Sequence, residues 1–89
     1  MVLLITYDLH KPDRDYAGME RLIKSARSWA HLEGSVWLID TAESAEAWRD
    51  KLKNEASEAT YFVVRLQHTW SSWKLNQDVI NWLHDSRAW

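Results

Sequence analysis

A nearly unbroken run of apolar and β-favouring residues at positions 2–9 (VLLITYDL) constrains the fold more than any other feature. A strand that is covered on both faces has such a run, because neither face needs polar side chains. The run gives way to His10, Lys11 and Pro12, and proline lacks the backbone N–H that a sheet ladder requires. We therefore predict that these residues form a central strand.

Two later segments carry apolar side chains at the spacing of an amphipathic helix. Residues 16–27 follow Asp15, which we predict to be the N-cap of the first helix. Residues 45–56 follow Thr41 and Ser44, either of which can cap the second helix. Acidic residues come early and basic residues late in this second segment, as the helix dipole favours.

The remaining periodicity indicates strands. Residues 29–41 alternate with a period of about two, and Gly34 can supply the positive φ of a tight hairpin turn. Residues 60–66 (TYFVVRL) are a further β-favouring run. The resulting βαββαβ order predicts a ferredoxin-like α+β domain with a four-stranded antiparallel sheet. The first strand is central in that fold, in agreement with its apolar run.

The last part of the chain, residues 68–89, extends a ferredoxin-like core of about 2–67. The stretch 68–74 (HTWSSWK) is irregular and can hold a short strand, and Asn76 is predicted to open a final helix. Three apolar side chains of that helix are expected to face inward: Val79, Ile80 and Leu83. We therefore predict one domain over 1–89, with an appended C-terminal helix.

Composition narrows the range of functions. The chain has no cysteine, so a disulfide framework and a thiolate metal site are both excluded. A net charge of -2 with evenly spread charges counts against strong, sequence-independent nucleic-acid binding. Neither a membrane span nor a signal peptide is evident, which predicts a cytoplasmic protein. Seven tryptophans exceed what one small core easily absorbs, so some are expected at a partner surface.

Two short motifs suggest a family. The first strand ends in Tyr7-Asp8, and the later hairpin contains Ser35-Val36-Trp37. In these features, over about 2–67, the chain resembles the small CRISPR-associated Cas-two proteins and their relatives, the VapD-type toxins. The resemblance implies a ferredoxin-like, two-fold homodimer. It also implies an integrase as partner in the Cas-two setting, or an antitoxin in the VapD setting.

Asp8 is the candidate catalytic and metal-binding residue. The resemblance implies that it lies near its counterpart across the dimer interface, where some family members bind a divalent metal and cut RNA or DNA. Two such carboxylates repel each other unless a cation or a proton lies between them. Mg²⁺ suits the arrangement, with Mn²⁺ as the alternative, and a bound metal activates water for hydrolysis. Alternatively, Asp8 caps the following loop through backbone amides.

The neighbours of Asp8 are candidates for contact with a substrate. These are Tyr7, His10, Lys11 and Arg14; the last three can contact phosphate or act as acid or base, and they equally suit a solvated loop. The other histidines show no metal-ligand spacing. No arrangement for serine catalysis is evident around Ser35.

The C-terminal tryptophans Trp70, Trp73 and Trp82 are predicted to pack the last helix against the sheet or to form a dimer or partner surface. The leading hypothesis is therefore a Cas-two-like homodimer that acts as a metal-dependent endonuclease on RNA or DNA. The alternative is a non-catalytic dimerisation or protein-interaction module of the same fold. A VapD-like RNA-cutting toxin is a third hypothesis.

Overall fold

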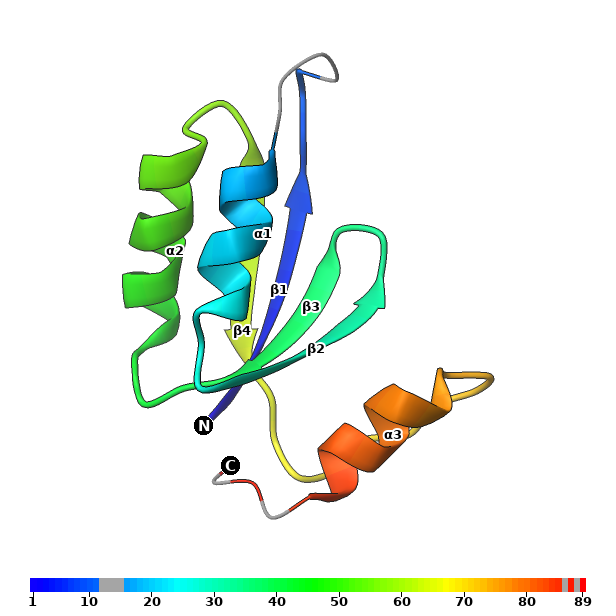
Figure 1. Cartoon of the computed structure of the whole chain (residues 1–89). Coiled ribbons are helices and arrows are strands. Elements are labelled where there is room, and N and C mark those ends of the chain that lie inside the picture. The colour runs from blue at the N-terminus through cyan, green and yellow to red at the C-terminus, as the bar shows by residue number, and fades with distance from the viewer. Residues whose placement is uncertain (12–15, 86, 88) are drawn as a thin grey trace.

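The computed structural model, which describes residues 1–11, 16–85, 87 and 89, places the elements in the predicted order. Along the chain they are β1 (Val2–Asp8), α1 (Ala17–Lys24), β2 (Ser28–Glu33), β3 (Val36–Asp40), α2 (Ala45–Glu55), β4 (Thr60–Arg65) and α3 (Gln77–His84). The four strands form one antiparallel sheet in the order β2-β3-β1-β4 (Figure 1). The chain therefore has the predicted ferredoxin-like α+β architecture with a C-terminal helix.

β1 lies at the centre of the sheet, between β3 and β4, as its apolar run predicts. Successive side chains of a strand point to opposite faces. Leu3 and Ile5 join the core beneath α1 and α2, while Val2 and Leu4 belong to a second cluster beneath α3. The first half of β1 is thus covered on both faces. We call the face that is turned away from α1 and α2 the distal face.

The core between the sheet and the first two helices is built around two buried tryptophans, Trp37 of β3 and Trp48 of α2. The other buried members of this cluster are Leu3, Ile5, Met19, Ile23, Ile39, Leu52 and Ala56. The members on α1 and those in and just after α2 are four residues apart, so each helix turns one apolar stripe to the sheet. Large aromatic side chains give this small domain much of its buried apolar area.

The first helix is shorter than the sequence pattern predicts. α1 has 8 residues, with Tyr16 at its N-cap position and no side-chain hydrogen bond there. The predicted cap, Asp15, lies outside the described residues. Within α1, Lys24 forms an i,i+4 ion pair with Glu20, and its hydrogen bond and charge lower the pKa of the Glu20 carboxyl. The hairpin between β2 and β3 turns as predicted at Gly34, whose φ is 44°.

Ser44, and not Thr41, caps α2. The Ser44 hydroxyl accepts a hydrogen bond from the Ala47 N–H at 3.1 Å. Thr41 is buried, and its hydroxyl accepts hydrogen bonds from the Glu43 N–H and from the Trp48 indole. Thr41 therefore joins the loop before α2 to the core.

Replacing Ser44 by Ala should lower the free energy of unfolding by about 1 kcal/mol, because one orphan donor of α2 loses its partner. For a domain of this size the melting temperature should fall by about 4–8 °C. Thermal unfolding followed by circular dichroism measures the change. An unchanged melting temperature would show that the cap contributes nothing to stability.

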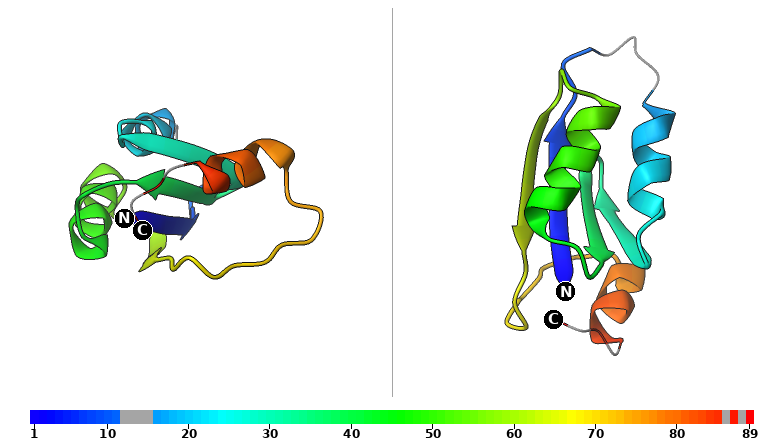
Figure 2. Two further views of the ribbon diagram at one scale, coloured as in Figure 1. Left: turned by 90° about the horizontal axis from the view of Figure 1, so that it is seen from below. Right: turned by 90° about the vertical axis from the view of Figure 1, so that its left-hand side faces the viewer.

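α3 covers the end of the distal face that lies furthest from Asp8. Its buried side chains are Val79, Trp82 and Leu83, which pack against Val2, Ala30 and Leu38 of the sheet. Figure 2 (left) shows α3 and its connecting loop on the opposite side of the sheet from α2. The prediction that Ile80 completes the inward stripe is wrong, because Trp82 takes that place and its indole donates to Ser28 Oγ at 2.8 Å. None of the described helices has the length and apolarity that crossing a membrane requires.

No strand forms at 68–74, although the sequence allowed one there. The last sheet-like bond of β4 runs from the Leu66 N–H to the Val2 carbonyl, and the chain then leaves the sheet towards α3. A strand needs a neighbour for its backbone groups, and no backbone hydrogen bond joins 68–74 to another segment within the described part of the chain. Trp70 and Leu75 instead pack by their side chains against the α3 cluster.

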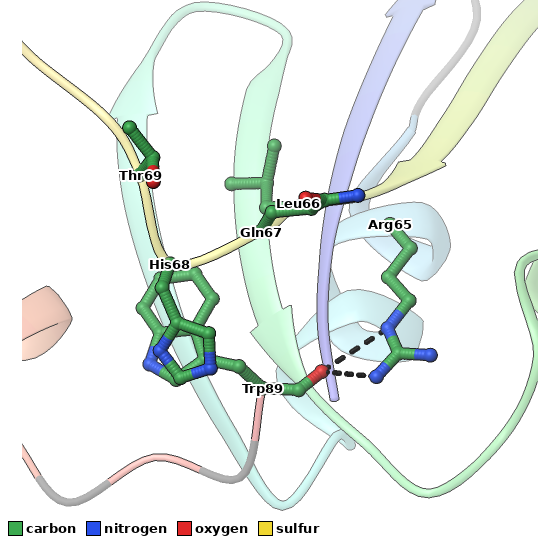
Figure 3. Close-up of a pocket in the computed structure, with 6 residues that line it drawn as sticks. All are labelled: Arg65, Leu66, Gln67, His68, Thr69 and Trp89. Atoms are coloured by element: carbon green, nitrogen blue, oxygen red, sulfur yellow. Dashed lines mark hydrogen bonds between the residues drawn. The ribbon is translucent and has the colours of Figure 1, made fainter.

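Two arginines hold the C-terminal tail at the end of the sheet. Arg87 forms an ion pair with Asp40 at 3.3 Å, stacks on Trp82 at 3.9 Å and donates to its carbonyl. Arg65 donates twice to the main-chain oxygen of Trp89, beside a pocket of about 510 Å³ (Figure 3). Trp89 of the tail also packs against the second cluster, beneath α3.

Candidate functional site

Asp8 is the last residue of β1, at the end of the sheet opposite to α3. Its side chain is exposed, and no hydrogen bond or ion pair joins its carboxylate to another residue in the described parts of the chain. The alternative hypothesis, in which Asp8 caps its own loop, therefore has no support among residues 9–11. The carboxylate oxygens are available for an external ligand.

The register of the sheet sets the surroundings of Asp8. Asp8 lies directly opposite Thr60 of β4, and His10 Nε2 is hydrogen bonded to Thr60 Oγ1 at 2.8 Å. The imidazole is exposed and is fixed beside the strand end by this bond. Thr60 therefore lies beside both Asp8 and His10, and its side chain is bonded to His10.

Tyr7 lies on the other side of the sheet from Asp8. Its side chain packs against the core beneath the helices, and its hydroxyl accepts a hydrogen bond from the Trp37 indole at 3.2 Å. Adjacent residues of a strand point to opposite faces, so the Tyr7 hydroxyl does not join the Asp8 carboxylate in one site. The Tyr7-Asp8 motif thus combines a packing residue with an exposed acid.

Two basic residues were also predicted near this site. Lys11 is exposed at the start of the loop that follows β1. Arg14 lies outside the described residues. Among the predicted substrate contacts, His10 is therefore the one that the structure joins to the Asp8 end of the sheet by a specific bond.

A shallow hollow of about 160 Å³ lies at this end of the sheet. Its lining residues are Thr6, Tyr7, Asp8, Thr60, Tyr61 and Phe62. Phe62 is 62% exposed and stands directly opposite Thr6 on the distal face. Sequence reasoning did not find Thr60 and Phe62. The alternation of side chains along 60–65 shows which of these residues share a face. It does not show which of them lie beside Asp8 until the register with β1 is known.

The described residues of one chain offer a small set of metal ligands. No group of three or more His, Asp or Glu side chains gathers among them in a way that could hold a metal ion. Mg²⁺ commonly binds through one or two carboxylates and keeps several water ligands, and carboxylate and water ligands also suit Mn²⁺. The exposed oxygens of Asp8 meet that requirement in part. One chain therefore supplies one exposed carboxylate at this end of the sheet.

The three candidate tryptophans have different environments. Trp82 is buried within its own chain, and Trp70 is partly buried against the α3 cluster. Both serve the intramolecular packing that was one of the two predicted uses. Trp73 is 86% exposed and lines a hollow of about 450 Å³ with Leu32 and Glu33 of β2. Of these three tryptophans, Trp73 is therefore the one that offers a large exposed apolar surface to a partner.

The fold and the site define an α+β protein of ferredoxin-like architecture with one exposed carboxylate at the end of its central strand. Comparisons of the chain with models of protein families, with curated proteins and with solved structures find no match. The functional argument therefore depends on the geometry of the site.

Proposed function

We propose that this protein is a Cas-two-like homodimer that cuts RNA or DNA with a divalent metal ion at a site shared by the two Asp8 carboxylates. The observation that supports this proposal is the exposed carboxylate at the end of the central strand, which has no hydrogen bond or ion pair among the described residues. An acid that caps a loop or forms an ion pair would have a hydrogen-bond or charged partner, and none is found for the Asp8 carboxylate among the described residues. Such an activity implies a cytoplasmic location.

The proposed dimer places one Asp8 from each copy at the two-fold axis. Cyclic dimers use the same surface patch on both subunits, and Trp73 is the exposed tryptophan that suits such a patch. Trp73 lines a hollow with Glu33, and the adjacent turn accepts a hydrogen bond from the Tyr7 N–H through the Ser35 carbonyl at 3.2 Å. A partner bound at the Trp73 hollow would therefore lie next to a turn that is hydrogen bonded to the end of β1 that carries Asp8.

Within this site each residue has a distinct role. A divalent ion held by Asp8 would supply an activated water and stabilise charge on the phosphate. Asp8 would bind that ion, and two copies would supply two carboxylates. His10, held by Thr60, would lie where it can exchange a proton with the substrate or bind its phosphate. Lys11 would add positive charge beside the scissile group.

The second candidate function is a non-catalytic dimerisation or protein-interaction module. The absence of a three-ligand group in the described part of the chain favours it, because one chain does not form a metal site on its own. A module would use the exposed Trp73 and need no metal. An integrase or an antitoxin is the kind of partner that the family resemblance suggests.

The two functions can be separated by incubating the protein with labelled single-stranded RNA and with double-stranded DNA. Reactions contain Mg²⁺, Mn²⁺ or EDTA, and sedimentation gives the oligomeric state of the same sample. The endonuclease proposal predicts a dimer and cleavage that EDTA abolishes. A dimer without metal-dependent cleavage would support the module, and a strict monomer at high concentration would contradict the shared site.

A further inference from the structure

We infer that the Asp8 end of the distal face binds a single-stranded nucleic acid, with one nucleobase stacked on Phe62. This inference rests on the proposed function for the class of ligand, and it deepens that function by selecting single strands over duplexes. The structural basis is an exposed aromatic ring in the same hollow as the proposed metal-binding carboxylate.

Phe62 is unusual for a sheet residue of a small domain because 62% of its surface is exposed. It is on β4 opposite Thr6, while Asp8 is opposite Thr60 two residues earlier in β4. Asp8 and Phe62 are thus diagonal neighbours on one face of an antiparallel pair. Such neighbours are typically about 7–8 Å apart and within reach of an aromatic side chain.

That separation suits a single nucleotide. A phosphate close to Asp8, through a divalent ion, would leave the attached base near the Phe62 ring. Aromatic side chains exposed on a sheet are a common platform for bases, because every base has a face that can stack. His10 and Lys11 follow Asp8 at the same end of the sheet and can contact the phosphate backbone.

The same geometry disfavours a duplex. In a double helix the faces of the bases are stacked on each other, so a base reaches Phe62 only if it is first unstacked, which costs energy. A single strand offers its bases without that cost. The even charge distribution of the chain also fits recognition by stacking better than recognition by a broad basic groove.

A second copy of this chain is the other occupant that could cover Phe62. The inference requires that the dimer proposed above, which uses the Trp73 surface, leaves the Phe62 ring accessible. If Phe62 instead belongs to the dimer interface, its truncation should produce monomers. The test therefore measures the oligomeric state together with binding.

The experiment measures the binding of fluorescein-labelled oligouridine, oligodeoxythymidine and a duplex of equal length by fluorescence anisotropy. Ca²⁺ replaces Mg²⁺ so that an ion with oxygen ligands is present at Asp8, and a gel checks that the oligonucleotides stay intact. Phe62→Leu keeps apolar bulk but removes the aromatic face, and Phe62→Trp is the matched variant that restores stacking. We expect Phe62→Leu to raise the Kd for the single strands by about 5- to 100-fold. Phe62→Trp should bind like the wild type, and the duplex should bind more weakly than the single strands.

Three results would overturn the inference: equal affinities of wild type and Phe62→Leu, no preference for single strands, or a monomeric Phe62→Leu protein. An absence of binding by the wild type would also overturn it. Because binding is measured without cleavage, the proposed function is tested separately. Binding that depends on Phe62 without metal-dependent cleavage would refute the endonuclease alone, whereas cleavage without that dependence would refute the stacking site alone.

Discussion

Replacing Asp8 by Asn should lower the rate of metal-dependent cleavage by about a hundredfold or more. A metal ion stabilises charge in the transition state by several kcal/mol, and each 1.4 kcal/mol corresponds to about a tenfold rate change. Asparagine keeps the size of the side chain but removes the negative charge that holds the ion. Rates of cleavage of labelled RNA and DNA, measured against Mg²⁺ concentration, give the size of the loss.

The fold should tolerate this substitution, which makes the interpretation direct. Asp8 is exposed and has no side-chain partner among the described residues. The substitution should therefore change the free energy of unfolding by less than about 0.5 kcal/mol. Asp50→Asn is the matched control, because Asp50 is an exposed acid on α2 that pairs with its neighbour Arg49. Equal activities of the two variants would mean that Asp8 has no part in the chemistry.

Replacing Arg87 by Met should destabilise the domain by up to about 3–5 kcal/mol, because it leaves the buried Asp40 carboxylate with the more distant N-terminal ammonium, 3.8 Å away, in place of the guanidinium. The side chains of Asp40 and Arg87 are 7% and 10% exposed. Arg87 also stacks on Trp82 and donates to its carbonyl. Removing the guanidinium should therefore release the tail and loosen α3. Urea unfolding measures the free energy, and hydrogen exchange of α3 amides shows where the loss is located.

Two comparison variants define the cause of this loss. Arg49→Met removes an exposed ion pair and should change stability by no more than about 1 kcal/mol. The double substitution Asp40→Asn with Arg87→Met removes both buried charges and should recover part of the loss. If Arg87→Met and Arg49→Met have the same stability, the buried pair does not hold the tail.

The central strand and the two layers were predictable from the sequence because burial leaves a direct signal. An apolar run without alternation at 2–9 indicated a strand covered on both faces, and β1 proved to be central. The helical spacing of apolar residues within 45–56 indicated an amphipathic helix, and Trp48, Leu52 and Ala56 of that segment are all buried. Local periodicity carries this information because each element turns a fixed face to the core.

The surroundings of the site were less predictable because they depend on contacts between distant segments. Periodicity does not determine the register between 2–9 and 60–66, so neither Thr60 nor Phe62 could be placed beside Asp8. One position on the inward face of α3, Ile80, was predicted wrongly for a similar reason, whereas Val79 and Leu83 are buried as predicted. Trp82 is buried because its indole meets Ser28 of β2, 54 residues away. Ile80 and Trp82 are both apolar, and helical spacing alone does not choose between them.

The measurement that tests the central claim most directly is the stoichiometry of Mn²⁺ binding, followed by electron paramagnetic resonance of the free ion. A site shared by two Asp8 carboxylates predicts one Mn²⁺ per two chains, and Asp8→Asn should abolish that binding while Asp50→Asn should preserve it. No binding by the wild type, or one ion per chain that survives Asp8→Asn, would contradict the shared site.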